Sequence, residues 1–147
     1  MTDLLITRAL PNPLGKDRFD NFAPNILLNQ EWVEFVNRRD IPLRLTGVSV
    51  WHETFDGLER TGEQELAAFC DHVVLLAGWT LRLHTGRGTP YNEGTVHHSF
   101  LDRENYVWNN DAGDRVTLRD WKNEVIDSAW YAPYPPEGMI LLRRDAA

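Results

Sequence analysis

The chain has 147 residues, of which 42% are hydrophobic and 25% are charged. This length and balance are typical of one folded domain with its own core, and they exclude a disordered chain. Its 15 basic and 22 acidic side chains leave a net charge of −7. Because nucleic-acid binding depends on Lys and Arg at the phosphates, the acidic balance argues against DNA or RNA as a partner.

Cys70 is the one cysteine of the chain, which rules out an internal disulfide. We expect its thiol to be buried beside Phe69 as a small hydrophobic group. The segment MTDLLITRALPNP lacks the basic start and long apolar run of a signal peptide, and no segment is apolar enough to cross a membrane. The sequence therefore predicts a cytoplasmic protein without membrane insertion, or an envelope or secreted one if a signal was trimmed.

Alternation of apolar and polar residues is the main pattern along the chain. It occurs, in chain order, in segments 4–10, 31–37, 43–51, 79–85, 114–120 and 123–131. In the second of these, Val33 and Phe35 would face one side and Trp32 and Glu34 the other. A period of two is typical of half-buried strands, so we expect six strands here, separated by turns rich in Gly, Asn and Asp.

Segment 61–73, TGEQELAAFCDHV, is the one helix candidate. Thr61 is an N-cap type of residue, and Glu63 and Glu65 would lie in the first turn. The apolar face is narrow, however, so a strand or an irregular segment stays an open alternative.

Two stretches, 13–25 and 87–105, lack periodicity and are expected to be long loops. We expect residues 1–135 to form the domain and residues 136–147 to form a C-terminal tail. Within the tail, segment 139–142 is apolar enough to add a last edge strand or to meet a partner.

Short strands, few helices and frequent turn residues predict an all-β domain with roughly seven or eight strands in two packed antiparallel sheets. Without a disulfide between the sheets, aromatic side chains would have to supply the buried area. The tryptophans expected in the core are Trp32, Trp51, Trp79 and Trp108.

Several segments occur in an order that resembles the lamin tail domain family, in its stand-alone prokaryotic form. They are EWVEFVN, LRLTGVSV, LLAGWTLRLHTGRGT, VWNNDAGDRVTLRD and EVIDSAWY, after an NP-G-D segment near the N-terminus. The resemblance covers about residues 5–131, and stretch 52–72 matches poorly. It implies an immunoglobulin-like β-sandwich of about seven to nine antiparallel strands, used for binding or tethering, with no shared catalytic residues and no obligatory cofactor.

The segment VWNNDAGDRVTL (107–118) is rich in oxygen ligands. Asp111 and Asp114 would suit a calcium loop or a pair of catalytic carboxylates. The twelfth position counted from Asn109 is Asp120 rather than Glu, however, and the flanks are strands. Asn and Asp side chains bond readily to nearby backbone N–H groups, and Gly113 accepts left-handed angles, which favours a structural turn.

The histidines are His52, His72, His84, His97 and His98. A zinc site needs three or four converging ligands, whereas adjacent His97 and His98 point to opposite faces of an extended segment. We therefore expect no metal and no cofactor. A fortuitous ion at His97, His98 or Asp111, and a hydrolase built on a loop carboxylate or metal, stay open alternatives.

Four aromatic residues are candidates for an exposed binding surface, namely Tyr91, Trp130, Tyr131 and Tyr134. They would suit a carbohydrate-binding module, which is the second hypothesis. The leading hypothesis is a non-enzymatic interaction module that binds a protein partner through loops 13–25 and 87–105 or through edge strands. Pairing of segment 139–142 between two copies would give a homodimer.

Overall fold

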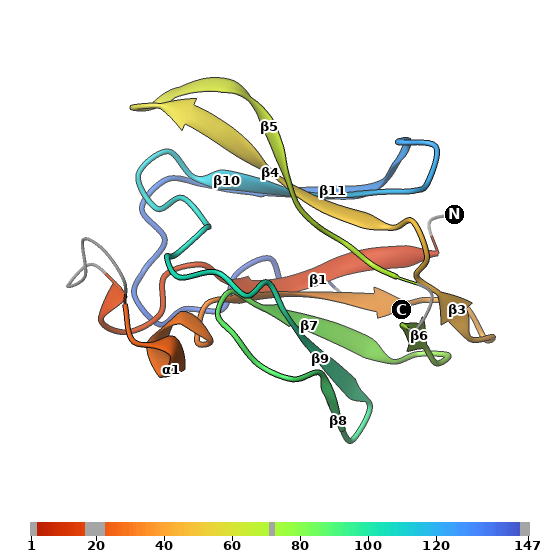
Figure 1. The fold of residues 1–147 in the computed structure, drawn as a ribbon. Helices are drawn as coiled ribbons and strands as arrows, with labels where there is room; N and C mark the ends of the chain where they lie inside the picture. The colour runs from red at the N-terminus through yellow and green to blue at the C-terminus, as the bar shows by residue number, and fades with distance from the viewer. Residues whose placement is uncertain (1–2, 17–22, 71–72, 145–147) are drawn as a thin grey trace.

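Two β-sheets face each other in the computed structural model, which describes residues 3–16, 23–70 and 73–144. The strands are β1 (Leu4–Leu10), β2 (Trp32–Asn37), β3 (Leu43–Arg44), β4 (Ser49–Asp56), β5 (Glu59–Ala68), β6 (Val74–Leu75), β7 (Thr80–His84), β8 (Tyr91–Glu93), β9 (Val96–Phe100), β10 (Asp114–Arg119) and β11 (Val125–Tyr131). One sheet has the order β1–β2–β7–β9–β8 and the other β11–β10–β4–β5 (Figure 1). The small sheet β3–β6 lies at one end of this sandwich.

Alternate residues of the facing strands fill the space between the sheets, as the period of two predicts. The core side chains that are at most 1% exposed include Ile6, Phe35, Val50, Leu81, Leu83, Val116 and Leu118. Burying one such side chain stabilises the fold by about 1.5–3 kcal/mol. The six predicted strands are confirmed, except that segment 43–51 is divided between β3 and β4 by the turn at Gly47.

Of the four tryptophans predicted for the core, Trp108 lies within it and is 2% exposed. Trp32 is buried outside the main core cluster, where the Arg82 guanidinium lies 4.1 Å from its ring centroid. Trp79 packs against the core and is half-buried, as is Trp51. The side chains of Leu, Ile, Val and Phe therefore fill most of the core, in which a larger share of tryptophan was expected.

Segment 61–73 forms no helix in its described part, and the strand alternative is confirmed up to Ala68, because these residues belong to β5, which pairs antiparallel with β4. The two strands are joined by a two-residue loop, Gly57–Leu58, since Asp56 pairs with Glu59, and Gly57 at its first position has a φ of 61°. Such a turn strongly favours a hairpin, and the hydrogen bonds to β4 outweigh the weak helix preference of this segment. Cys70 follows the strand and is exposed, which corrects its predicted burial. Residues 71–72 lie outside the described residues.

The loop predicted for 87–105 contains the β8–β9 hairpin, which turns at Gly94. Strand β9 pairs with β7 in parallel, so the sheets are not wholly antiparallel. Together with the two-residue strands β3 and β6, this hairpin brings the strands of the described residues to more than the expected seven to nine. The short helix α1 (Asn25–Leu28) begins at the end of predicted loop 13–25, of which residues 17–22 lie outside the described part.

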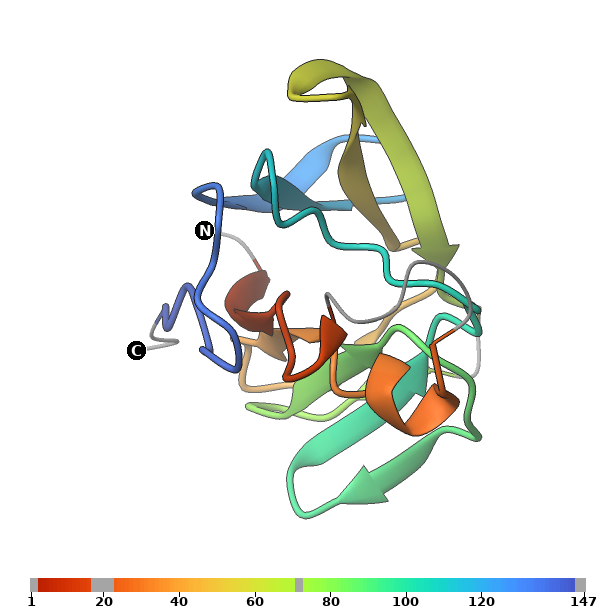
Figure 2. The same cartoon turned by 90° about the vertical axis from the view of Figure 1, so that its left-hand side faces the viewer.

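The described part of the C-terminal tail runs beside β1 (Figure 2). Leu141 forms an isolated antiparallel bridge with Ala9, and the Arg144 N–H donates to the Thr7 carbonyl at 2.7 Å. The predicted edge strand is thus reduced to one bridge, but the tail covers the outer edge of β1. No helix in the described ranges is long and apolar enough to cross a membrane.

Candidate functional site

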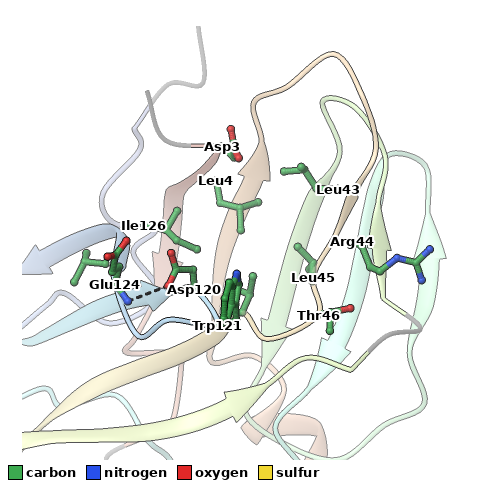
Figure 3. A pocket seen from close by; sticks show the side chains of 12 residues that line it. Asp3, Leu4, Leu43, Arg44, Leu45, Thr46, Asp120, Trp121, Glu124 and Ile126 are labelled. Atoms are coloured by element: carbon green, nitrogen blue, oxygen red, sulfur yellow. Dashed lines mark hydrogen bonds between the residues drawn. The ribbon is translucent and has the colours of Figure 1, made fainter.

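An open groove of about 380 Å³ lies at the end of the sandwich where the β10–β11 turn meets β1 and β3 (Figure 3). Its apolar lining comes from Leu4, Leu43, Leu45, Val48, Val125 and Ile126. The indole of Trp121 stands among these side chains although it is 75% exposed (Figure 3). We call this feature the Trp121 groove.

The turn that carries Trp121 is held by its own hydrogen bonds. The Asp120 carboxylate accepts the backbone N–H of Lys122 at 2.9 Å and that of Glu124 at 3.0 Å. This is the Asx type of turn, in which a side chain fixes the backbone that follows it. Trp121 is therefore an exposed side chain on an ordered backbone, which lowers the entropy cost of using it as a contact.

Gly47 brings the β3–β4 turn directly against Trp121. Its φ is 76°, and a Cβ added at this position would lie 2.7 Å from the Trp121 Cβ. No side chain fits there without moving one of the two turns. The close approach of Gly47 thus fixes the distance between the β3 wall of the groove and the Trp121 wall.

Replacing Gly47 by alanine is expected to destabilise the protein more than replacing Gly57. Gly57 has a φ of 61° with no atom near its missing Cβ, so Gly57→Ala carries only the left-handed backbone cost of about 1–2 kcal/mol. Gly47→Ala adds the clash with Trp121. Urea unfolding of the two variants measures the difference, and equal losses would show that the Gly47 approach is not tight.

Further apolar side chains are exposed around the same end of the sandwich. They are Ile41 in the β2–β3 loop, Val74 in β6, Leu76 in the β6–β7 loop, and Val125 in β11. The strands and loops that carry them lie at the same end of the sandwich as the β10–β11 turn (Figure 1), and of the four only Val125 lines the groove. Scattered exposed apolar residues are normal on folded proteins, so the apolar character of this end rests chiefly on the side chains that line the groove.

Charged groups line one side of the Trp121 groove more than the other. Asp120 and Glu124 lie on the Ile126 side, and Arg44 lies on the β3 side (Figure 3). Asp3 is the third lining carboxylate and lies 3.8 Å from Arg39. Three carboxylates against one guanidinium leave the lining with a formal charge of −2.

The four aromatic residues predicted as a binding surface are not all brought together. Tyr131 is buried, and its hydroxyl donates to the Asn109 carbonyl at 2.8 Å. Burial, with the charges of Asp114 and Glu31, raises the pKa of Tyr131 well above its ordinary value. Three stay exposed, namely Tyr91 on β8 of one sheet, Trp130 on β11 of the other and Tyr134 beyond β11.

Segment 107–118 forms the predicted structural turn, and its buried carboxylate is Asp114. The Asp114 side chain is 0% exposed and accepts the backbone N–H groups of Glu53 at 2.9 Å, Asn109 at 3.1 Å and Arg115 at 2.7 Å. Asp111 is exposed on the same turn. The two carboxylates therefore differ in role, since one organises backbone and the other faces solvent.

His97 and His98 point to opposite faces of β9, as predicted. His97 Nδ1 lies 2.7 Å from the Asn92 amide oxygen, whereas His98 Nδ1 lies 2.8 Å from His84 Nε2. Burial is the main cause that lowers the pKa of His84 and of His97. The described residues hold no group of three metal-ligating side chains, and His72 lies outside them.

A buried ion pair joins Lys16 to Glu31, the residue just before β2, and sequence reasoning missed it. Lys16 Nζ lies 2.7 Å from Glu31 Oε2, and their side chains are 9% and 0% exposed. The other oxygen, Glu31 Oε1, accepts the Thr85 hydroxyl at 2.6 Å and the Val107 N–H at 2.9 Å. The hydrogen bonds and ion pair of Glu31 therefore hold together the segments that carry Lys16, Thr85 and Val107.

Two facing sheets without a disulfide in the described residues define an immunoglobulin-like all-β domain. The family model described as Lamin Tail Domain matches residues 1–132, and the chain belongs to this family of non-catalytic domains of the protein-interaction type. No curated protein matches the chain. The family match spans every residue that lines the Trp121 groove.

Proposed function

We propose that this protein is a non-enzymatic interaction module that binds a segment of another protein in the Trp121 groove. The observation that carries the proposal is an indole 75% exposed on an ordered turn beside an apolar hollow of about 380 Å³. Tryptophan is enriched among the residues that dominate binding energy at interfaces. The volume falls within the roughly 300–1,000 Å³ of ordinary ligand pockets.

Three of the four sheet edges, those of β1, β8 and β5, are poorly suited to strand addition, and this favours the groove as the binding site. The tail covers β1 through the Leu141–Ala9 bridge, and β8 has only three residues. Strand β5 is a long edge, but it carries Glu59, Glu63 and Glu65, and such charges protect an edge from pairing. The groove also lies outside loops 13–25 and 87–105, so we move the expected contact to the Trp121 end.

The carboxylates offer little support for a hydrolase. Asp114 sits 3.3 Å from His52 Nδ1, which resembles the acid–base pairs of enzymes. Its oxygens already accept three backbone N–H groups, however, and His52 Nε2 lies 3.2 Å from the Gln64 amide oxygen. A general base needs a free nitrogen within reach of the substrate proton, and here both ring nitrogens are engaged.

Selection from a displayed random-peptide library with the full chain as bait tests the proposal. We expect enriched peptides whose affinity falls at least about tenfold, or about 1.4 kcal/mol, in Trp121→Ala. Trp130→Ala is the matched control, because it removes another exposed indole, and we expect affinity within about twofold of wild type. Failure to enrich any peptide, or binding that survives Trp121→Ala in folded protein, would count against the groove.

The carbohydrate hypothesis keeps a specific observation in its favour, since Trp130 is 50% exposed and Tyr134 is 71% exposed near the end of β11. Aromatic faces of this kind suit sugar rings. The Trp130→Ala variant therefore serves a second purpose on a glycan array, where loss of a specific signal would support sugar binding.

A further inference from the structure

We infer that the segment bound in the Trp121 groove carries one large apolar side chain with Lys or Arg close to it in sequence. This inference rests on the proposed function and adds the chemistry of the partner. The apolar part follows from the walls of the groove. Leu4, Leu43, Leu45 and Ile126 surround a common space beside Trp121 (Figure 3), and only an apolar side chain gains free energy by displacing water from it.

The basic part follows from the carboxylates on the Ile126 side. Glu124 is exposed, and its carboxylate makes no hydrogen bond or ion pair with another residue of the described part. Asp120 uses one oxygen, Oδ1, for the two backbone N–H groups of the turn. A Lys or Arg placed beside these carboxylates would be attracted by their charge, and salt would weaken this attraction because Glu124 is exposed and Asp120 is only partly buried.

The different charges on the two sides of the groove also indicate how the bound segment is oriented. Asp120 and Glu124 lie on the Ile126 side, whereas none of the carboxylates that line the groove comes from β3 (Figure 3). Lys122 already lies 5.1 Å from the Trp121 ring centroid, so the partner's cation is expected at the carboxylates rather than over the indole. The apolar side chain would then enter between Trp121 and Leu45, with its basic neighbour over Glu124.

Charge also decides against a second copy of this chain as the occupant. Two copies joined through the same end would bring together two linings that each carry a formal charge of −2, so the net interaction between the two patches is repulsive. The net charge of −7 adds repulsion at longer range. An acidic peptide or a nucleic acid would meet the same repulsion, whereas a basic segment is attracted.

The displayed-library selection gives the test when it is run in parallel on wild type, Glu124→Lys and Glu104→Lys. Glu104 is an exposed carboxylate in the β9–β10 loop, so its reversal makes the same change in net charge away from the groove. On wild type we expect Lys and Arg to rise at least about twofold within three positions of the apolar anchor. We expect this enrichment to persist on Glu104→Lys and to disappear on Glu124→Lys.

Calorimetry on the best Trp121-dependent peptide gives the affinity. Replacing its Lys and Arg residues by Gln is expected to weaken binding by about fivefold or more at about 50 mM salt, and by less at about 300 mM, because salt screens surface charges. The Glu124→Lys variant should lower affinity for the basic peptide by a similar factor, and Glu104→Lys by less than about twofold.

The outcomes separate the two claims. Absence of Trp121-dependent peptides would overturn the proposed function and this inference with it. Trp121-dependent peptides with no basic preference, or with acidic residues beside the anchor, would overturn the inference alone. Light scattering that shows a dimer of the full chain, lost in Trp121→Ala, would overturn it in favour of a second copy.

Discussion

Replacing Glu31 by alanine is expected to lower the free energy of unfolding by about 3–5 kcal/mol. The substitution leaves the Lys16 ammonium buried without a counter-charge, and it also removes the acceptor for the Thr85 hydroxyl and the Val107 N–H. An uncompensated buried charge costs far more than the loss of a surface ion pair. Urea unfolding followed by tryptophan fluorescence measures the change.

Two further variants test whether the buried charge is the cause of the loss. Glu124→Ala removes an exposed carboxylate with the same charge, and we expect a change within about 0.5 kcal/mol. In the double variant Lys16→Met, Glu31→Gln no charge stays buried, and the amide oxygen can still accept a hydrogen bond. It should therefore be more stable than Glu31→Ala. A loss below about 1 kcal/mol in Glu31→Ala would mean that water reaches the pair.

Asp114→Asn is expected to cost about 2–4 kcal/mol, because each hydrogen bond to a charged group is worth about 1.5–3 kcal/mol and an amide replaces an acceptor by a donor. The carboxylate is 0% exposed and holds the start of β10 against β4 through the Glu53 N–H. The matched control is Asp111→Asn in the same turn, where the side chain is exposed. Equal effects of the two changes would contradict the assigned role of Asp114.

The pH dependence of the same variant tests the contact between Asp114 and His52. Burial lowers the pKa of His52, but the hydrogen bond and charge of Asp114, with the Gln64 hydrogen bond, raise it above its ordinary value of about 6.5. His52 therefore adds stability that is fully present below about pH 6.5 and is lost as the pH rises through the folded-state pKa. In Asp114→Asn burial prevails, so the pKa of His52 falls and low pH becomes destabilising.

The stability difference between wild type and Asp114→Asn should therefore be larger at about pH 5.5 than at about pH 8.5. Comparing the two proteins cancels the contributions of His84 and His97, whose lowered pKa values have the opposite sign. A proton NMR titration of the His52 ring gives the shift directly. If the stability difference between wild type and Asp114→Asn does not change with pH, His52 and Asp114 are not coupled as proposed.

The strands that could be predicted from sequence are those whose alternation is local. Strands β2 and β7 show it clearly because one face of each packs on the core. Strand β5 could not be separated from a helix, since its exposed face and two register shifts against β4 weaken the period. Strand β9 was not predicted. Its main partner is β7, and two parallel strands are not joined by a tight turn that the sequence would reveal.

The Trp121 groove could not be predicted, because its walls come from segments far apart in sequence that meet only in the folded chain. One local signal was available in Trp121 itself. It is a large apolar residue in a polar turn, outside the alternating pattern of the two neighbouring strands. The Lys16–Glu31 pair gave no such signal, because charged residues are nearly always exposed.

Asp3 lines the groove at the point where the described chain enters β1. A peptide fused ahead of this residue through a short flexible linker would therefore begin beside its own binding site. Its effective concentration there would be in the millimolar range, enough to fill a site that binds the free peptide weakly. Such a tethered ligand would turn a transient encounter into a stable intramolecular complex, and it would mask the groove from every other partner.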